Sequence, residues 1–93
     1  MAYYIRTYPP TDTISGPFKT IAEARREVTD FRFTSRARIF KGADATCALD
    51  ARYYVGKATR TYSGQKWLWV YADANGRSCV INRDGTLGRR YQL

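Results

Sequence analysis

The 93-residue sequence contains no histidine, and this absence excludes several kinds of catalytic and metal site. Without imidazole there is no His-based catalytic triad, no histidine general base and no common catalytic zinc site. Only two cysteines are present, Cys47 and Cys79, and they lack the C-x-x-C spacing of metal sites. They predict two buried free thiols, with a disulfide as the alternative. We therefore expect no metal, no cofactor and no enzyme activity.

Long apolar runs are also missing. No window approaches the roughly 18 consecutive apolar residues that a membrane span requires. The first residues alternate like a strand and lack the charged head and apolar run of a signal peptide. We expect a cytoplasmic protein without a membrane partner. A chain of this length can build one hydrophobic core, so residues 1–93 are predicted to form a single domain.

Acidic residues are scarce, because eight Asp and Glu stand against 16 Lys and Arg, and the formal net charge is +8. Most of the excess lies in residues 51–93. Arginine is three times as common as lysine, and guanidinium groups pair with phosphate or carboxylate and stack on aromatic planes. The composition predicts an acidic partner, either nucleic acid or an acidic protein surface.

The first half of the chain predicts a strand, a helix and a second strand. Ala2 to Tyr8 alternates like a strand and is stopped by Pro9-Pro10, after which a loop is expected up to Pro17. Thr20 and Glu23 have the spacing of a capping box, and apolar residues then recur at helical spacing, which predicts an amphipathic helix from Thr20 to Phe31. A strand is predicted over Ala37–Lys41, and residues 42–51 are compatible with a loop or one helical turn.

From Arg52 onwards, short strands alternate with turn residues, as in an antiparallel meander. The turns contain Ser63-Gly64, Asn75-Gly76 and Asp84-Gly85. The predicted strands are Arg52–Tyr62, Lys66–Ala72, Arg77–Asn82 and Thr86–Gln92. The predicted fold is α+β, with one helix packed on a mainly antiparallel sheet of about four to six strands in β-α-β-β-β-β order.

The most informative segment is Lys66–Ala72, where Trp67, Trp69 and Tyr71 alternate with aliphatic residues. In a strand this pattern gives one aromatic and one aliphatic face. Either the aromatic face fills the core beneath the helix, or it is exposed and stacks on bases while nearby cations neutralise phosphates. The predicted binding residues are Trp67, Trp69, Tyr71, Arg52, Tyr53, Lys57, Arg60, Lys66 and Arg77.

Two local resemblances are limited in extent. The stretch Gly16-Pro17-Phe18-Lys19-Thr20 leading into Glu23-Ala24 is similar to the strand-to-helix entries of many small bacterial and phage proteins, SPOR-like domains among them. It covers about a dozen residues and no matching repeat follows, so peptidoglycan binding is not implied. In size and basicity the chain resembles bacterial RelE-type messenger-RNA interferases, but these have two successive helices where this sequence predicts one.

Three functions follow from these patterns. The first is non-enzymatic binding of RNA or single-stranded DNA through an arginine-rich and aromatic surface. The second is a protein-binding inhibitor or adaptor, for example a phage-encoded factor that blocks a host nucleic-acid machine, since Trp, Tyr and Arg dominate interface hot spots. The third is a metal-independent ribonuclease that uses Arg, Lys and Tyr. A homodimer formed by paired sheets is compatible with the first two.

Overall fold

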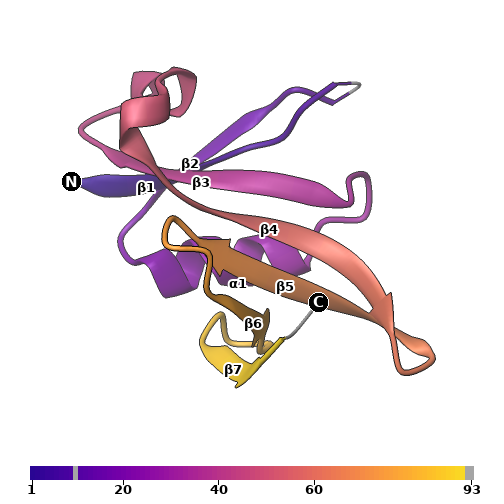
Figure 1. The fold of residues 1–93 in the computed structure, drawn as a ribbon. Helices are drawn as coiled ribbons and strands as arrows, with labels where there is room; N and C mark the ends of the chain where they lie inside the picture. The colour runs from indigo at the N-terminus through magenta and orange to yellow at the C-terminus, as the bar shows by residue number, and fades with distance from the viewer. Residues whose placement is uncertain (10, 92–93) are drawn as a thin grey trace.

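The computed structural model describes residues 1–9 and 11–91, which form one antiparallel sheet with an α-helix on one face (Figure 1). The sheet has seven strands in the spatial order β2-β1-β3-β4-β5-β6-β7. The elements in chain order are β1 (Ala2–Arg6), β2 (Ile14–Phe18), α1 (Ile21–Thr29), β3 (Arg36–Gly42), the short 3-10 helices η1 (Ala45–Leu49) and η2 (Ala51–Tyr53), β4 (Tyr54–Ser63), β5 (Lys66–Asp73), β6 (Ser78–Ile81) and β7 (Leu87–Arg90).

The predicted α+β class is confirmed, whereas the predicted number and order of strands are wrong because β2 lies where a loop was expected. β2 contains Gly16 and Pro17, which are both rare in strands. An edge strand has a neighbour on one side only, so proline is tolerated there even though it has no amide hydrogen to donate. Gly16 has a φ of 137°, and a Cβ there would lie 2.7 Å from the ring of Tyr4 and 2.9 Å from the backbone oxygen of Tyr3. Close backbone packing against β1 therefore requires a glycine at this position.

The helix begins where its capping box predicts. The Thr20 hydroxyl accepts a hydrogen bond from the backbone amide of Glu23 over 3.1 Å, and the Glu23 carboxylate accepts one from the amide of Lys19 over 3.1 Å. The bond to Thr20 satisfies a free amide of the first turn, whereas the Glu23 carboxylate bonds the amide one residue before the cap instead of the amide of the cap itself. None of the described helices is long and apolar enough to cross a membrane.

The second half is the expected meander with small shifts at its ends. β4 begins at Tyr54 instead of Arg52, because Arg52 and Tyr53 belong to η2. The segment left open before it contains η1, and Asp44 and Asp50 cap the two short helices. The Asn-Gly and Asp-Gly turns place Gly76 and Gly85 at positive φ, as predicted for tight hairpins. The last strand was expected to reach Gln92, which lies outside the described residues, and β7 ends at Arg90.

Two cores pack on opposite faces of the sheet. The larger core lies beneath α1, which contributes Ala24, Val28 and Phe31. The smaller core lies beneath η1 and joins Tyr4 and Phe40 to Cys47 and Ala48. Both cysteines are free thiols, as the first of the two predictions states, but only Cys47 is buried as predicted, because Cys79 on β6 is half-buried.

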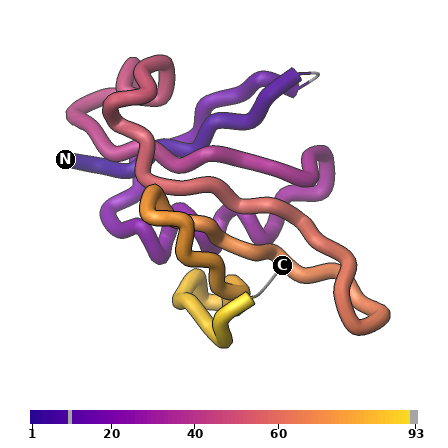
Figure 2. The backbone as a smooth tube through the Cα atoms, in the orientation of Figure 1, coloured from indigo at the N-terminus to yellow at the C-terminus, as the bar shows by residue number. Residues whose placement is uncertain are grey.

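The smaller core covers only one end of its face. Figure 2 shows η1 and η2 at one end of the sheet, while the β1–β2 and β4–β5 connections extend at the other end. Between them, the face opposite α1 has no covering element among the described residues. We call it the open face.

Candidate functional site

Three cationic side chains lie in one row across the open face. Arg6 on β1 is directly opposite Arg38 on β3, and Arg38 is directly opposite Lys57 on β4. Residues opposite each other on neighbouring strands project to the same face of a sheet. The neighbours Ile5 and Ile39 project to the other face and are fully buried beneath α1. The register therefore places Arg6, Arg38 and Lys57 side by side; we call them the cationic row.

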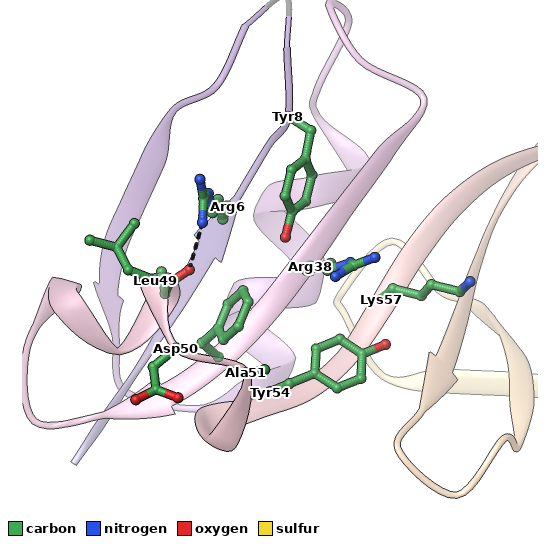
Figure 3. A pocket seen from close by; sticks show the side chains of 10 residues that line it. Arg6, Tyr8, Arg38, Leu49, Asp50, Ala51, Tyr54 and Lys57 are labelled. Atoms are coloured by element: carbon green, nitrogen blue, oxygen red, sulfur yellow. Dashed lines mark hydrogen bonds between the residues drawn. The ribbon is translucent and has the colours of Figure 1, made fainter.

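Two tyrosines frame the centre of this row. The guanidinium carbon of Arg38 lies 5.1 Å from the ring centroid of Tyr8 and 5.8 Å from that of Tyr54. The guanidinium carbon of Arg6 lies 5.2 Å from the Tyr8 ring. Figure 3 shows Arg38 between the two tyrosines, with Lys57 beyond it. These cation–π contacts hold a planar guanidinium group between two aromatic groups at the surface.

The row forms the floor of a hollow of about 450 Å³ between η1, η2 and the end of β1. Its lining residues are Arg6, Tyr8, Arg38, Phe40, Ala48, Leu49, Asp50, Ala51, Tyr54 and Lys57. A second hollow of about 550 Å³ adjoins it, shares Tyr8, Arg38 and Lys57, and adds Arg36 and Thr59. Together the two hollows make a continuous basic surface along the open face.

Hydrogen bonds hold the β1 side of the row. A terminal nitrogen of Arg6 donates to the backbone oxygen of Ala48 over 3.3 Å, as drawn in Figure 3. Its Nε lies 3.5 Å from Oδ1 of Asp12, close enough for an ion pair but without a hydrogen bond. The buried Thr7 hydroxyl accepts from the amide of Thr13 over 2.9 Å, which ties the loop after β1 to the start of β2. Arg6 is therefore positioned before any ligand arrives.

The one acidic side chain that lines the hollow in the described part of the chain, Asp50, is already paired with an arginine. Asp50 accepts hydrogen bonds from the guanidinium of Arg52, the shortest over 2.8 Å, and these bonds lower the pKa of its carboxyl group. Among the described residues no acid lies within ion-pair distance of Arg38 or Lys57. The burial of Tyr54 raises the pKa of its phenol, although the nearby Arg38 acts in the opposite direction. The site therefore presents positive charge and neutral aromatic rings.

This chemistry suits a ligand with phosphate groups and planar bases. Guanidinium and ammonium groups neutralise phosphates, while tyrosine rings and guanidinium planes stack on bases. The part of the chain that the structure describes holds no group of three or more His, Cys, Asp or Glu side chains that could bind a metal ion.

The aromatic stripe of β5 is divided between the core and the surface. Trp69 and Tyr71 are 9 % and 3 % exposed and pack beneath α1, as in the core alternative. Trp67 lies on the same face but beyond the end of the helix, and it is 58 % exposed. Leu68 and Val70 lie on the opposite face, as that alternative predicts.

The structure does not bring the other predicted binding residues into one surface. Lys57 belongs to the cationic row, while the guanidinium of Arg60 lies 5.6 Å from the ring of Trp67 on the opposite face. Arg52 and Tyr53 form η2, where Arg52 is paired with Asp50. Lys66 starts β5 at the hairpin tip, and Arg77 lies in the turn after β5.

Several site residues were missed by sequence reasoning. They are Arg6, Tyr8, Arg36, Arg38 and Tyr54. A signal was present in the sequence. Arg6 at the end of β1 and Tyr8 just after it are spaced by two residues, as are Arg36 and Arg38 on β3, and this is the spacing of side chains on one face of a strand. The period-two pattern of cations was visible, but the pairing of the two strands was not.

Comparisons with known proteins add no constraint to this picture, since no protein-family model, no curated protein and no solved structure matches the chain.

Proposed function

We propose that this protein is a cytoplasmic, non-enzymatic binding protein whose ligand is single-stranded nucleic acid, RNA or DNA, held on the open face. The observation that carries the proposal is the cationic row, in which three neighbouring strands place Arg6, Arg38 and Lys57 directly opposite one another.

The row is unfavourable for the protein alone. Like charges directly opposite each other on neighbouring strands destabilise a sheet, where cross-strand pairs contribute roughly 0.2–1 kcal/mol. The ion pair of Arg6 with Asp12 and the cation–π contacts of Arg6 and Arg38 offset part of this cost, but Lys57 is directly opposite Arg38 with no acid of the described chain within ion-pair distance. A bound phosphate would remove the repulsion, and the release of its counterions would favour binding.

The aromatic groups favour a single strand over a duplex. Bases in a duplex are stacked on one another and hidden, whereas unpaired bases can stack on side chains at about 1–3 kcal/mol per base. Tyr8, Tyr54 and the plane of Arg38 offer such stacking surfaces next to the cations. A duplex could use only the cations.

The test is the binding of a labelled single-stranded oligonucleotide of about 12 nucleotides, measured by fluorescence anisotropy at two salt concentrations. We expect saturable binding that weakens with salt, and weaker binding of a duplex of equal length. Arg38→Gln should reduce the affinity and the salt dependence, because it removes one phosphate contact. Arg83→Gln is the matched control, because Arg83 is an exposed arginine in the turn before β7, outside the hollows.

Absence of saturable binding, or equal effects of Arg38→Gln and Arg83→Gln, would rule the proposal out. The second candidate, a protein-binding inhibitor or adaptor, is favoured by one observation: Phe33, Tyr62 and Trp67 are each more than half exposed near the tip of the β4–β5 hairpin. It predicts binding to a protein that persists after nuclease treatment and high salt, and that is lost in Trp67→Ala. A ribonuclease would instead cleave RNA in the presence of a metal chelator.

A further inference from the structure

The tip of the β4–β5 hairpin carries a second basic and aromatic surface. β4 pairs with β3 only as far as Thr59. Residues 60–63 extend beyond the end of β3 and pair with β5, and the amide of Arg60 still bonds to the segment before β3. Trp67 is exposed there and lies against Tyr62, with ring centroids 5.2 Å apart. Arg60 lies over the Trp67 ring at 5.6 Å. A hollow of about 400 Å³ joins this tip to the segment before β3.

This tip surface is adjacent to the open face around the end of β3. Its hollow is lined by Arg32, Phe33, Thr34, Ser35, Arg60 and Trp67. The second hollow of the open face is lined by Arg36 and Thr59, which follow Ser35 and precede Arg60 in the chain. The backbone amide of Arg60 donates to the backbone oxygen of Ser35 over 2.7 Å, so these two segments are in contact. The two surfaces therefore meet where β3 begins.

The charges along this path are of one sign. From the cationic row the path passes Arg36 and then reaches Arg60 and Arg32. None of the described residues that line the second hollow or the tip hollow is acidic. A second copy of the chain would bring arginines against arginines at the tip, which is unfavourable. A polyanion with stacking groups complements the whole path.

We infer that one extended single strand of nucleic acid binds along both surfaces, with its phosphates on the cationic row and Arg36 and one of its bases stacked on Trp67 beyond the end of β3. This inference rests on the proposed function. It adds that the strand runs from the cationic row to Trp67 and that it must be long enough to reach both. A dinucleotide is too short to contact both surfaces at once, whereas a longer strand reaches from the cationic row to the tip.

The experiment compares single-stranded oligonucleotides of about 2 and about 12 nucleotides on the full chain, by anisotropy and by tryptophan emission. The short probe should change tryptophan emission little, because its phosphates are held at the cationic row, where three cations lie together, and Trp69 is buried. The long probe should quench the emission and bind more tightly. Trp67→Ala should weaken binding of the long probe about 5- to 150-fold and leave binding of the short probe unchanged.

Two further variants separate stacking from other effects. Trp67→Phe keeps an aromatic ring and should retain most of the extra affinity for the long probe. Leu87→Ala is the control, because Leu87 is an exposed apolar residue on β7, at the far edge of the sheet.

If both probes bind with salt dependence but the long one neither quenches the emission nor responds to Trp67→Ala, the path to the tip is wrong and the open-face function stands. If neither probe binds, both proposals fail.

Discussion

Nε of Arg25, on α1, donates a hydrogen bond to the backbone oxygen of Gly85 over 2.7 Å, and the guanidinium carbon lies 5.1 Å from the ring centroid of Tyr71. Arg25 is only 8 % exposed. A single buried cation therefore joins the helix to the β6–β7 turn, 60 residues away in the sequence, and also to the aromatic core under the helix.

Replacing this arginine should destabilise the fold. Arg25→Ala removes a charged hydrogen bond, leaves the Gly85 carbonyl without its partner and opens space beside Tyr71, and we expect a loss of about 2–3 kcal/mol in the free energy of unfolding. Arg26→Ala on the exposed side of α1 is the control, with an expected change within about 0.5 kcal/mol. Urea denaturation measures both, and equal effects would contradict the role assigned to Arg25.

A comparison of alanine substitutions at Gly85 and Gly76 separates the cost of steric contact from the cost of backbone strain. Both have positive φ, +90° and +84°, but a Cβ at Gly85 would lie 1.9 Å from the backbone oxygen of Ala22, whereas at Gly76 nothing lies within 4 Å. Gly76→Ala should cost about 1 kcal/mol from the backbone alone. Gly85→Ala should cost clearly more, because the hairpin must move away from α1. Similar unfolding midpoints for the two variants would show that the turn is not packed on the helix.

The Tyr71 hydroxyl is buried and has no hydrogen-bond partner among the described residues. Burial raises the pKa of this phenol to about 12, and Arg25 acts in the opposite direction. The unfolded chain releases the proton near pH 10 and the folded protein near pH 12, so this contribution to stability is complete below pH 10 and is lost as the pH rises from about 10 to about 12.

Tyr71→Phe tests whether the hydroxyl is unpaired and whether its pKa is raised. The measurement is the free energy of unfolding at several pH values. At neutral pH the variant should be as stable as the parent protein, or more stable by up to about 1 kcal/mol, because an unpaired polar group is removed. Its advantage should grow between pH 10 and pH 12. Tyr54, whose pKa burial also raises, remains in both proteins and cancels in the comparison. Parallel pH profiles would contradict the assignment to Tyr71.

Lys57 is expected to lower the stability of the fold while it strengthens the binding of nucleic acid. Lys57→Thr removes the charge opposite Arg38 and introduces a residue that favours strands, so the free energy of unfolding should stay the same or rise by up to about 1 kcal/mol. The affinity for single-stranded nucleic acid should fall. Lys66→Thr is the stability control, because Lys66 is opposite the uncharged Ser63. A clear loss of stability in Lys57→Thr would show that the lysine is structural.

The helix, the meander and the class of fold were predictable because their signals are local. The capping box at Thr20 and Glu23 marks the start of α1, and the Asn-Gly and Asp-Gly pairs mark two of the hairpins. β2 was not predictable, because Gly16 and Pro17 argue against a strand anywhere except at an edge, and the sequence does not show which strand lies at the edge.

The site was harder to predict because it depends on strand pairing between distant segments. The pattern at Trp67, Trp69 and Tyr71 correctly indicated a strand with an aromatic face, but where α1 ends decides which of these rings is buried. The cationic row depends on the register of three strands from separate parts of the chain. Alternating cations in one strand are visible in the sequence, whereas their neighbours across the sheet become visible only in the fold.

The two edges of the sheet are both unfavourable for pairing with a strand from another copy of the chain. At one edge, Pro17 on β2 cannot donate a hydrogen bond to an added strand. At the other edge, β7 has only four residues and ends in Arg89 and Arg90, which a second basic chain would meet as like charges. Growth of the sheet into a continuous ribbon of copies is therefore blocked at both ends. At high concentration the chain should resist fibre formation even though more than half of its secondary structure is strand.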